Sequence, residues 1–412
     1  MKKTLLTVLM SSSAILLTAC GSGDDDWNIS GGEQIPVNNI QNPVVNVTAY
    51  TKDGMLGIAA DSQLMTYKML GVDNKEVTAT ALVFVPNKPQ PANGWPIVVW
   101  AHGTTGVADK CAPSQQGLQG TQVLLQQLLL EGYVVVAPDY EGLGAEGNHP
   151  FLNLKSEAFS ITDAVVATRD YLSRQGKKAA PQWMTVGHSQ GGHAALGAAQ
   201  YASRAQLDYK GTIAIAPASN LSAILLGGEA FAVGKPAAVQ SYIYSPLDAF
   251  TLLIVDGMQG HQTSVDYSTV FKGNLATLIP TIKGECFGQI ESGIQQDMFN
   301  FSLQNGNSLE NYGRTQTGFM ALPQIDTFLN KTSQPLSAKV STPVIIYQGG
   351  SDQTVPKAAT DTLVASARLN GTVIEDKNYR IGPWDHTGAY TLNINNIVTD
   401  VKLMMPTPTR MP

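Results

Sequence analysis

The sequence Gly187-His188-Ser189-Gln190-Gly191 lies between a short apolar run, 183–186, and a run of small residues, 192–199. The first run predicts a buried strand and the second predicts a helix that can pack closely. A Gly-x-Ser-x-Gly pentapeptide between a strand and a helix is the pattern of a nucleophile elbow, a tight turn that holds its serine in a strained backbone conformation. The two glycines leave room where strand and helix crowd together. We therefore predict that Ser189 is a nucleophile held above the end of a sheet.

A nucleophilic serine needs a base, and the base needs an orienting carboxylate. In proteins with this elbow the three residues follow in the order serine, acid, histidine. Asp352 follows the apolar run 343–348, which predicts a strand, and the carboxyl end of such a strand faces the crevice where α/β sheets bind ligands. His386 is the only histidine after Asp352. We expect Asp352 to be the acid and His386 the general base.

Two other carboxylates compete for the role of the acid. Asp385 adjoins His386 in the chain, so its side chain should point away from the ring. Asp376 is the alternative if Asp352 is only a turn residue, as aspartate often is. Residues 372–374, just before Asp376, are expected to form the last strand.

An oxyanion hole should come from two backbone amides. One belongs to Gln190, at the positive end of the helix after the elbow. The other belongs to Thr104 or Thr105, in the glycine-containing loop after an apolar strand at 97–100. His102, in the same loop, is expected to brace it by a hydrogen bond. His188 and His193 flank the elbow, where packing or supporting contacts are the expected roles.

Composition excludes several classes of function. The chain has 43% apolar and 14% charged residues, which is typical of a large, well-packed globular protein. Its net charge of -6 argues against a nucleic-acid partner, whose phosphates require a basic face. No spacing of His, Cys and carboxylates suggests a metal site, and no glycine-rich phosphate loop is present, so no cofactor is expected. The sequence does not indicate the oligomeric state.

The N-terminus predicts export. Met1-Lys2-Lys3 is basic, and an apolar stretch from Thr4 to Leu17 follows that is shorter than the roughly 20 residues a membrane span needs. Leu17-Thr18-Ala19-Cys20 resembles a bacterial lipoprotein processing box, which implies a signal peptide over 1–19, a lipid on Cys20 and a tether over 20–46. Gly21, in place of an aspartate, implies by the same resemblance the outer membrane, facing the periplasm or the exterior. Cleavage of an ordinary signal peptide at Ala19, with free secretion, is the alternative.

The chain has three cysteines. If Cys20 carries lipid, Cys111 and Cys286 remain as an even pair in an oxidising compartment. We predict that they form a disulfide between the loop after the oxyanion strand and a later insertion. Two separate buried thiols are the alternative.

Strands and helices alternate over most of the chain. Runs at 65–70 and 77–85 predict an antiparallel hairpin, after a surface segment at 28–46. Predicted helices at 123–130 and 156–172 then alternate with apolar strands, at 133–137 and 211–216 among others. This alternation predicts an α/β fold with a mostly parallel sheet covered by helices on both faces.

The alternation ends after Pro217. Apolar, helix-compatible pieces follow at 221–226, 249–255 and 323–329, the last with Pro323 at a first helical position. We expect residues 217–340 to form a helical cap over the strand ends, inserted into a core made of 47–216 and 341–412. A cap excludes water and supplies apolar walls for a substrate. An insertion that packs beside the sheet is the alternative.

Several motifs together resemble the secretory lipase family, which includes fungal lipase A-type enzymes and bacterial relatives. They cover roughly Val77 to Thr387 and comprise Ala101 to Gly106, Ala137 to Gly144, His149 to Leu152, Gly187 to Gly191 and Gly350 to Asp352. The resemblance implies an α/β-hydrolase with a helical cap that acts on carboxylic esters or acylglycerols through Ser189, Asp352 and His386. It also implies that Asp139-Tyr140 and His149-Pro150 shape the loops beside the site.

Two other functions stay open. Asp139-Tyr140 with Gly142 and Gly144 is similar to sequences of prolyl-type serine peptidases, although no propeller-like repeat precedes the elbow. A non-catalytic, lipid-binding lipoprotein is the second alternative, but it has no need for serine, acid and histidine in order. Lipase and esterase activity are not distinguished by the sequence.

Overall fold

The computed structural model describes residues 29–30, 33–55 and 57–407, and a nine-stranded sheet forms its centre. The strands lie in the order β11-β10-β9-β8-β6-β7-β5-β4-β3. Neighbours from β11 to β7 in that order are parallel, and β5, β4 and β3 continue the sheet antiparallel. The strands are β3 Val44–Ala49, β4 Ala59–Leu70, β5 Glu76–Pro86, β6 Trp95–Ala101, β7 Val134–Pro138, β8 Ala179–His188, β9 Asp208–Ile215, β10 Val344–Gly349 and β11 Tyr379–Gly382, with a separate pair β1 Ile29–Ser30 and β2 Glu33–Gln34. The mostly parallel sheet and the β4–β5 hairpin confirm the predicted fold class.

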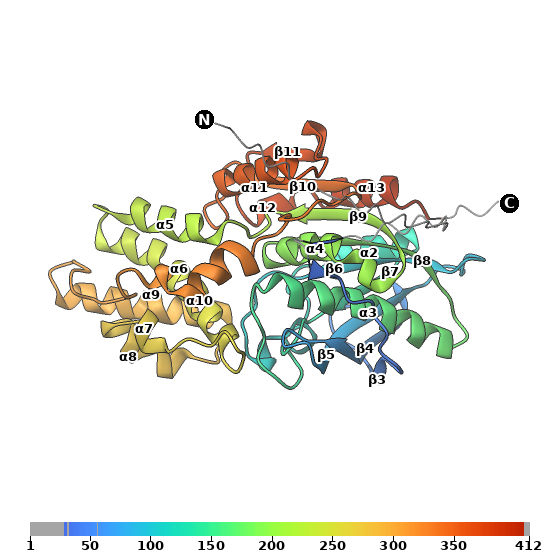
Figure 1. Ribbon diagram of the computed structural model, residues 1–412, viewed down its shortest axis with the longest axis horizontal. Helices are drawn as coiled ribbons and strands as arrows, with labels where there is room; N and C mark the ends of the chain where they lie inside the picture. Colours follow the sequence, from blue (N-terminus) through green and yellow to red (C-terminus); the bar gives the residue numbers. More distant parts are fainter. Residues whose placement is uncertain (1–28, 31–32, 56, 408–412) are drawn as a thin grey trace, which may run out of the picture.

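Helices cover both faces of this sheet (Figure 1). Side chains alternate along β6, so Ile97 and Val99 join one apolar cluster with α3, α4 and α11, whereas Val98 and Trp100 join another with α2, α12 and α13. The helices are α1 Pro113–Gln116, α2 Gln122–Glu131, α3 Leu154–Arg174, α4 Gln190–Gln200, α5 Leu221–Ala232, α6 Ala237–Met258, α7 Tyr267–Val270, α8 Gly273–Ile282, α9 Phe287–Gln304, α10 Pro323–Thr327, α11 Lys357–Leu369, α12 Gly388–Thr391 and α13 Ile394–Met404.

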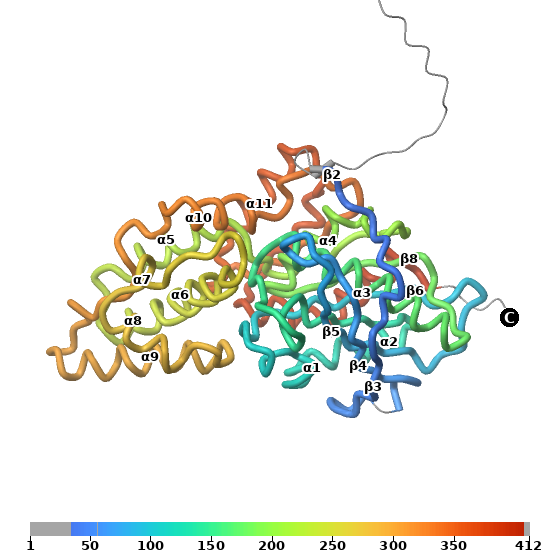
Figure 2. The backbone as a smooth tube through the Cα atoms, turned by 60° about the horizontal axis from the view of Figure 1, so that its bottom comes forward, coloured from blue at the N-terminus to red at the C-terminus, as the bar shows by residue number. Residues whose placement is uncertain are grey.

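Helices α5 to α10 gather at one end of the molecule, and the views in Figures 1 and 2 agree on this arrangement. They bury an apolar cluster of their own, which includes Leu252, Ile290 and Phe328. Pro323 opens α10, where its missing N–H costs nothing. Among the described residues, α6 alone is long and apolar enough to cross a membrane by length and composition, but more than half of its most apolar window is buried inside the protein. This burial is typical of a core helix in the group α5 to α10.

One predicted strand is wrong. Residues 372–374 are not part of the sheet, and the strand at that edge is β11, which pairs in parallel with β10 from Ile346 opposite Tyr379. Thr372 Oγ1 instead accepts a hydrogen bond from the Val340 amide, at 2.9 Å, and the Ile374 carbonyl accepts one from Arg368 Nε, at 2.8 Å. These polar contacts tie the segment to α11 and to the chain before β10, so it does not join the ladder.

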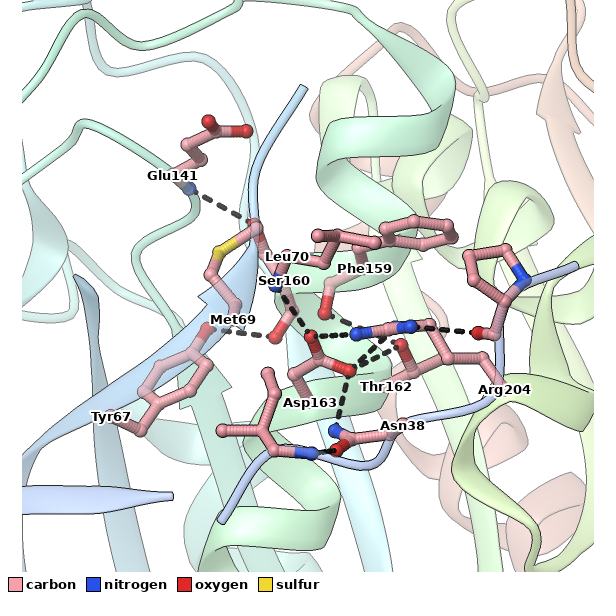
Figure 3. Close-up of polar contacts among 12 residues, drawn as sticks. Asn38, Tyr67, Met69, Leu70, Glu141, Phe159, Ser160, Thr162, Asp163 and Arg204 are labelled. Atoms are coloured by element: carbon pink, nitrogen blue, oxygen red, sulfur yellow. Dashed lines mark hydrogen bonds and ion pairs between the residues drawn. The ribbon is translucent and has the colours of Figure 1, made fainter. Parts of the chain in front are cut away.

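The segment at 28–46, which we expect to run over the surface, is held against the core through residues 35–38. Asn38 Nδ2 donates to Asp163 Oδ1 of α3 over 2.8 Å, and Arg204 forms an ion pair with the same buried carboxylate at 2.7 Å. Arg204 also donates to the Pro36 carbonyl over 2.7 Å, and Ile35 is buried. Figure 3 shows Asp163 between Asn38 and Arg204, so this part of the N-terminal segment is fixed to the core. The predicted signal peptide and Cys20 lie outside the described residues.

Candidate active site

Ser189 sits in the strained conformation that an elbow requires. It lies between the end of β8 and the start of α4, with φ 59° and ψ -121°. A positive φ is unfavourable for a residue with a side chain, so the surroundings must hold it. The Ser189 amide donates to the Ile215 carbonyl over 2.9 Å, and its own carbonyl accepts from His193 and Ala218, at 3.1 and 3.2 Å. These contacts with β9 and α4 fix the turn.

The two elbow glycines have no space for a side chain. A Cβ on Gly191 would lie 1.9 Å from the Ala101 carbonyl oxygen, and one on Gly187 would lie 2.0 Å from the Gly191 carbonyl oxygen. Both distances are far below van der Waals contact. The close approach of β6, β8 and α4 therefore requires glycine at both positions.

His386 and Asp352 are hydrogen-bonded to each other. His386 Nδ1 lies 2.7 Å from Asp352 Oδ2, and the buried carboxylate also accepts the amides of Thr354 and Val355 through Oδ1, each at 2.9 Å. The two competing carboxylates are engaged elsewhere. Asp385 Oδ1 caps the amide of Gly388 and the exposed Asp376 pairs with Arg368, each over 2.7 Å.

His188 supports the backbone of His386. Its Nε2 donates to the His386 carbonyl over 3.0 Å, and the two rings lie 4.7 Å apart. Burial, together with the nearby His386 ring, lowers the pKa of His188 to about 3. His188 is therefore neutral at pH 7 and adds no charge beside His386.

The loop after β6 lies beside the elbow because Ala101 pairs with Gly187 in the parallel ladder. A Cβ on Gly103 would lie 3.6 Å from that of Ser189. His102 braces this loop as expected, with Nδ1 2.7 Å from the Gly103 carbonyl, and Tyr140 donates to the His102 carbonyl over 3.0 Å. The structure thus brings Thr104, Thr105 and Gln190 to the same cavity as Ser189.

A buried polar network beneath the elbow was not foreseen from the sequence. The Gln190 side chain donates through Nε2 to Glu157 Oε1, at 2.8 Å, and to His149 Nε2, at 3.1 Å. The other oxygen of Glu157 lies 2.6 Å from His193 Nδ1, and His193 Nε2 donates to the Ser333 carbonyl over 2.9 Å. The side chains of Glu157, His149 and His193 are all buried.

One signal in the sequence could have identified Glu157. It lies at helical spacing with the apolar residues Leu154, Ile161 and Ala164, which predict a buried face of α3. A carboxylate on such a face must have a buried partner. His149, the partner of Gln190, is held neutral, because burial lowers its pKa to about 4 and its Nδ1 donates to the Glu141 carbonyl over 2.9 Å.

A cavity of about 820 Å³ opens at Ser189. Its lining includes Ser189, His386 and Asp352, and the helices α5, α6 and α9 contribute apolar side chains such as Leu225, Phe250 and Phe287. A largely apolar cavity with a few convergent polar groups is the usual form of a small-molecule site. In the described part of the chain, no group of three or more His, Cys, Asp or Glu side chains could hold a metal ion.

The disulfide predicted between Cys111 and Cys286 is present, with the two Cα atoms 5.4 Å apart. It joins η1, the short 3-10 helix Asp109–Cys111 after β6, to the residue that precedes α9. The alternative of two separate thiols is thus wrong for this structure.

Comparison with known proteins shows the fold and the family of this chain. The chain is similar to the rice cell wall degrading esterase LipA from Xanthomonas oryzae, with 18% identity and a TM-score of 0.62 over 88% of this chain and 97% of that one. It is similar to Candida antarctica lipase A in its closed state, with 18% identity and a TM-score of 0.65 over 90% and 84% of the two chains. At this identity the two structures support the fold alone, and no curated protein sequence matches. The family model of the secretory lipases matches residues 113–373, so the chain belongs to the secretory lipase family of carboxylic ester hydrolases.

Proposed function

We propose that Ser189, His386 and Asp352 form a catalytic triad that hydrolyses carboxylic esters through an acyl-enzyme. The observation that carries this proposal is the 2.7 Å contact of His386 Nδ1 with Asp352 Oδ2, in the cavity where Ser189 is held in its strained turn. Asp352 keeps the proton of His386 on Nδ1, which leaves Nε2 as the base. In this tautomer Nε2 can accept the proton of the serine hydroxyl.

The reaction proceeds in two displacements. Ser189 Oγ attacks the ester carbonyl carbon while His386 Nε2 takes its proton, and the resulting imidazolium returns the proton to the departing alkoxide as the C–O bond breaks. Water then gives a proton to His386 as it attacks the acyl-enzyme, and the proton returns to Ser189 Oγ as the acid leaves. Asp352 stabilises the imidazolium in both halves.

The oxyanion would be held by two amides. Gln190 is the first residue of α4, so its N–H belongs to the positive end of that helix. The amide of Thr104 or Thr105 is the second donor, and Gly103 lets that loop approach Ser189 closely. One such donor contributes about 3–4 kcal/mol to lowering the barrier.

Residues 217–340 act in this proposal as the cap, and the core consists of 47–216 with 341–412. The cap walls would hold the acyl chain. Phe231 and Tyr242 line the cavity and are also 58% and 65% exposed. Leu226, Val233 and Val239, close to them in the chain, are exposed as well. We expect these five side chains to form an apolar rim, which would favour esters presented on a lipid surface over small soluble esters.

Export and lipid attachment at Cys20 complete the proposal. Membership of a secretory family supports export, and the Cys111–Cys286 disulfide fits an oxidising compartment. Metabolic labelling with a palmitate analogue tests the lipid. Label on the wild-type protein that disappears in Cys20→Ala supports it, and an unlabelled wild type contradicts it.

Hydrolysis of p-nitrophenyl esters from acetate to palmitate, with Ser189→Ala in parallel, tests the ester-hydrolase proposal. The account predicts activity that is lost in the variant and rises toward long chains. A maximum at acetate or butyrate keeps the mechanism but makes the protein a small-ester esterase. Equal activity of wild type and variant on every ester contradicts the proposed role of Ser189.

A further inference from the structure

The first turn of the cap helix α9 is attached to the loop that we assign to the oxyanion hole. Three consecutive cap residues each contact a residue of the segment after β6. Glu285 Oε2 lies 2.7 Å from Lys110 Nζ, Cys286 is bonded to Cys111, and the Phe287 amide donates to the Thr105 carbonyl over 2.9 Å. These contacts join two parts of the chain that are 175 residues apart.

The oxyanion loop has few restraints of its own. Residues 102–106 belong to neither a strand nor a helix, so no ladder fixes their amides. The core holds the start of the loop, through the contacts of Tyr140 and His102 described above. The far end, at Thr105 and Gly106, is held by the cap.

The disulfide packs directly against this far end. A Cβ on Gly106 would lie 3.0 Å from Cys111 Sγ and 3.2 Å from the Cα of Cys286. Cys111 is fully buried and Cys286 is partly buried, so the bridge packs beneath the loop at its Cys111 end. Any shift of α9 would therefore pass to the backbone that carries the Thr104 and Thr105 amides.

We propose that the Cys111–Cys286 disulfide and the Phe287–Thr105 hydrogen bond are positioning elements of the active site, through which cap helix α9 sets the second oxyanion donor. The inference rests on the proposed function of the loop. An oxyanion donor acts on the transition state, so its displacement lowers kcat and leaves KM nearly unchanged. A bridge with a purely structural role would change the melting temperature without this kinetic signature.

Two variants separate the two contacts. Cys111→Ala with Cys286→Ala removes the bridge. Phe287→Pro removes the N–H that binds Thr105 and keeps the bridge. Proline suits the first position of a helix, and Cys286, with φ -77° and ψ 158°, already has the conformation favoured before proline. Phe287→Ala loses the same ring but keeps the N–H, and it is the reference for Phe287→Pro.

Lys110→Ala is the matched control. It removes only the exposed pair with Glu285, whose side chains are about half exposed. Such a pair contributes little to stability, so this variant should keep the wild-type kcat.

The experiment measures kcat and KM for p-nitrophenyl acetate, and the rate of inactivation by a p-nitrophenyl alkylphosphonate, with full-length protein below each variant's melting temperature. Inactivation forms a bond from Ser189 Oγ to phosphorus, releases p-nitrophenolate and passes the serine proton to His386. It places a phosphoryl oxygen where the oxyanion forms, so its rate reports on the donors.

We expect kcat and the inactivation rate of the double-alanine variant to fall at least about tenfold, a fraction of the 10²–10³-fold cost of losing a whole oxyanion donor. We expect kcat and the inactivation rate of Phe287→Pro to be lower than those of Phe287→Ala by a similar factor, with KM changed less than about twofold. Wild-type kcat and inactivation rate in a folded double-alanine variant, or equal rates in Phe287→Pro and Phe287→Ala, would overturn the inference. Full activity in Ser189→Ala would instead overturn the proposed function.

Discussion

The carboxylate of Glu157 lies 2.8 Å from the side-chain nitrogen of Gln190, the residue that follows the nucleophile. The same carboxylate contacts His193, one helical turn further along α4. A buried group on α3 thus holds the start of the helix whose first amide we assign to the oxyanion hole.

Glu157→Gln should lower both stability and kcat. The variant replaces a buried carboxylate oxygen that contacts His193 by an amide group, and a buried hydrogen-bonding group left without a partner costs about 1–3 kcal/mol. Urea unfolding measures the first effect, and ester hydrolysis by the folded variant measures the second. Asp170→Asn, which affects a partly exposed pair with Arg174 on the same helix, is the control and should cost less than about 1 kcal/mol. Equal stabilities of the two variants would contradict a structural role for Glu157.

His149→Gln should change how stability depends on pH. Burial lowers the pKa of His149 to about 4 in the folded protein, against 6.5 for an unperturbed histidine, so the unfolded chain binds more protons between these pH values. The contribution of neutral His149 is therefore complete above pH 6.5 and is lost as the pH falls toward 4. From pH 7 to pH 5, the unfolding free energy of the wild type should fall by about 2 kcal/mol more than that of the variant.

Urea unfolding of both proteins at the two pH values measures this shift. Comparison with the variant removes the opposing effect of carboxyls such as Asp139, whose pKa burial raises to about 6. A difference that is the same at both pH values would show that His149 titrates normally in the folded protein.

Gly191→Ala should lower the rate of ester hydrolysis on the order of 10²-fold or more. Its Cβ would lie 1.9 Å from the Ala101 carbonyl oxygen, so β6 and α4 must separate and Ser189 must move. A displacement of about 1 Å in an active site costs on the order of 10²-fold in rate. Gly288→Ala in α9 is the control, since nothing lies within 4 Å of its Cβ and alanine favours a helix. Ester hydrolysis by both variants is the measurement, and an active Gly191→Ala variant would contradict the packing of the elbow.

Val233→Asp should weaken action on lipid-borne esters only. Val233 is 73% exposed and lies two residues after Phe231 in the expected apolar rim, and a buried valine side chain contributes about 1.5 kcal/mol, or roughly tenfold in binding. We expect a loss of this size on emulsified tributyrin and little change on soluble p-nitrophenyl acetate. Leu369→Asp, on a residue that is 88% exposed at the end of α11, is the control. Equal losses in the two variants, or none, would contradict lipid contact at the rim.

Local sequence patterns were sufficient for the features that depend on chain order. The elbow around Ser189, the strand before Asp352 and the α/β alternation each follow from a short stretch of apolar and turn residues. The helical pieces after Pro217 were also recognisable, because amphipathic spacing is a local property.

Features that depend on contacts between distant segments were missed. The sequence around Glu157 does not indicate that Gln190 and His193 are its partners. The sequence around Thr105 does not indicate a contact with Phe287. Residues 372–374 have strand-forming side chains, but the edge of β10 is occupied by Tyr379–Gly382 instead. The sequence around Asn38 is likewise typical of a surface segment, and only the fold brings Asn38 to Asp163 and Arg204.

The most direct test of the triad is the mapping of a fluorophosphonate adduct by peptide mass spectrometry in the wild type, Ser189→Ala and Asp352→Asn. The account predicts one adduct, on Ser189, that is absent from Ser189→Ala and forms far more slowly in Asp352→Asn, because the imidazole loses its orientation. An adduct on another residue, or labelling of Asp352→Asn at the wild-type rate, would contradict the assignment of Ser189, His386 and Asp352 as the catalytic triad.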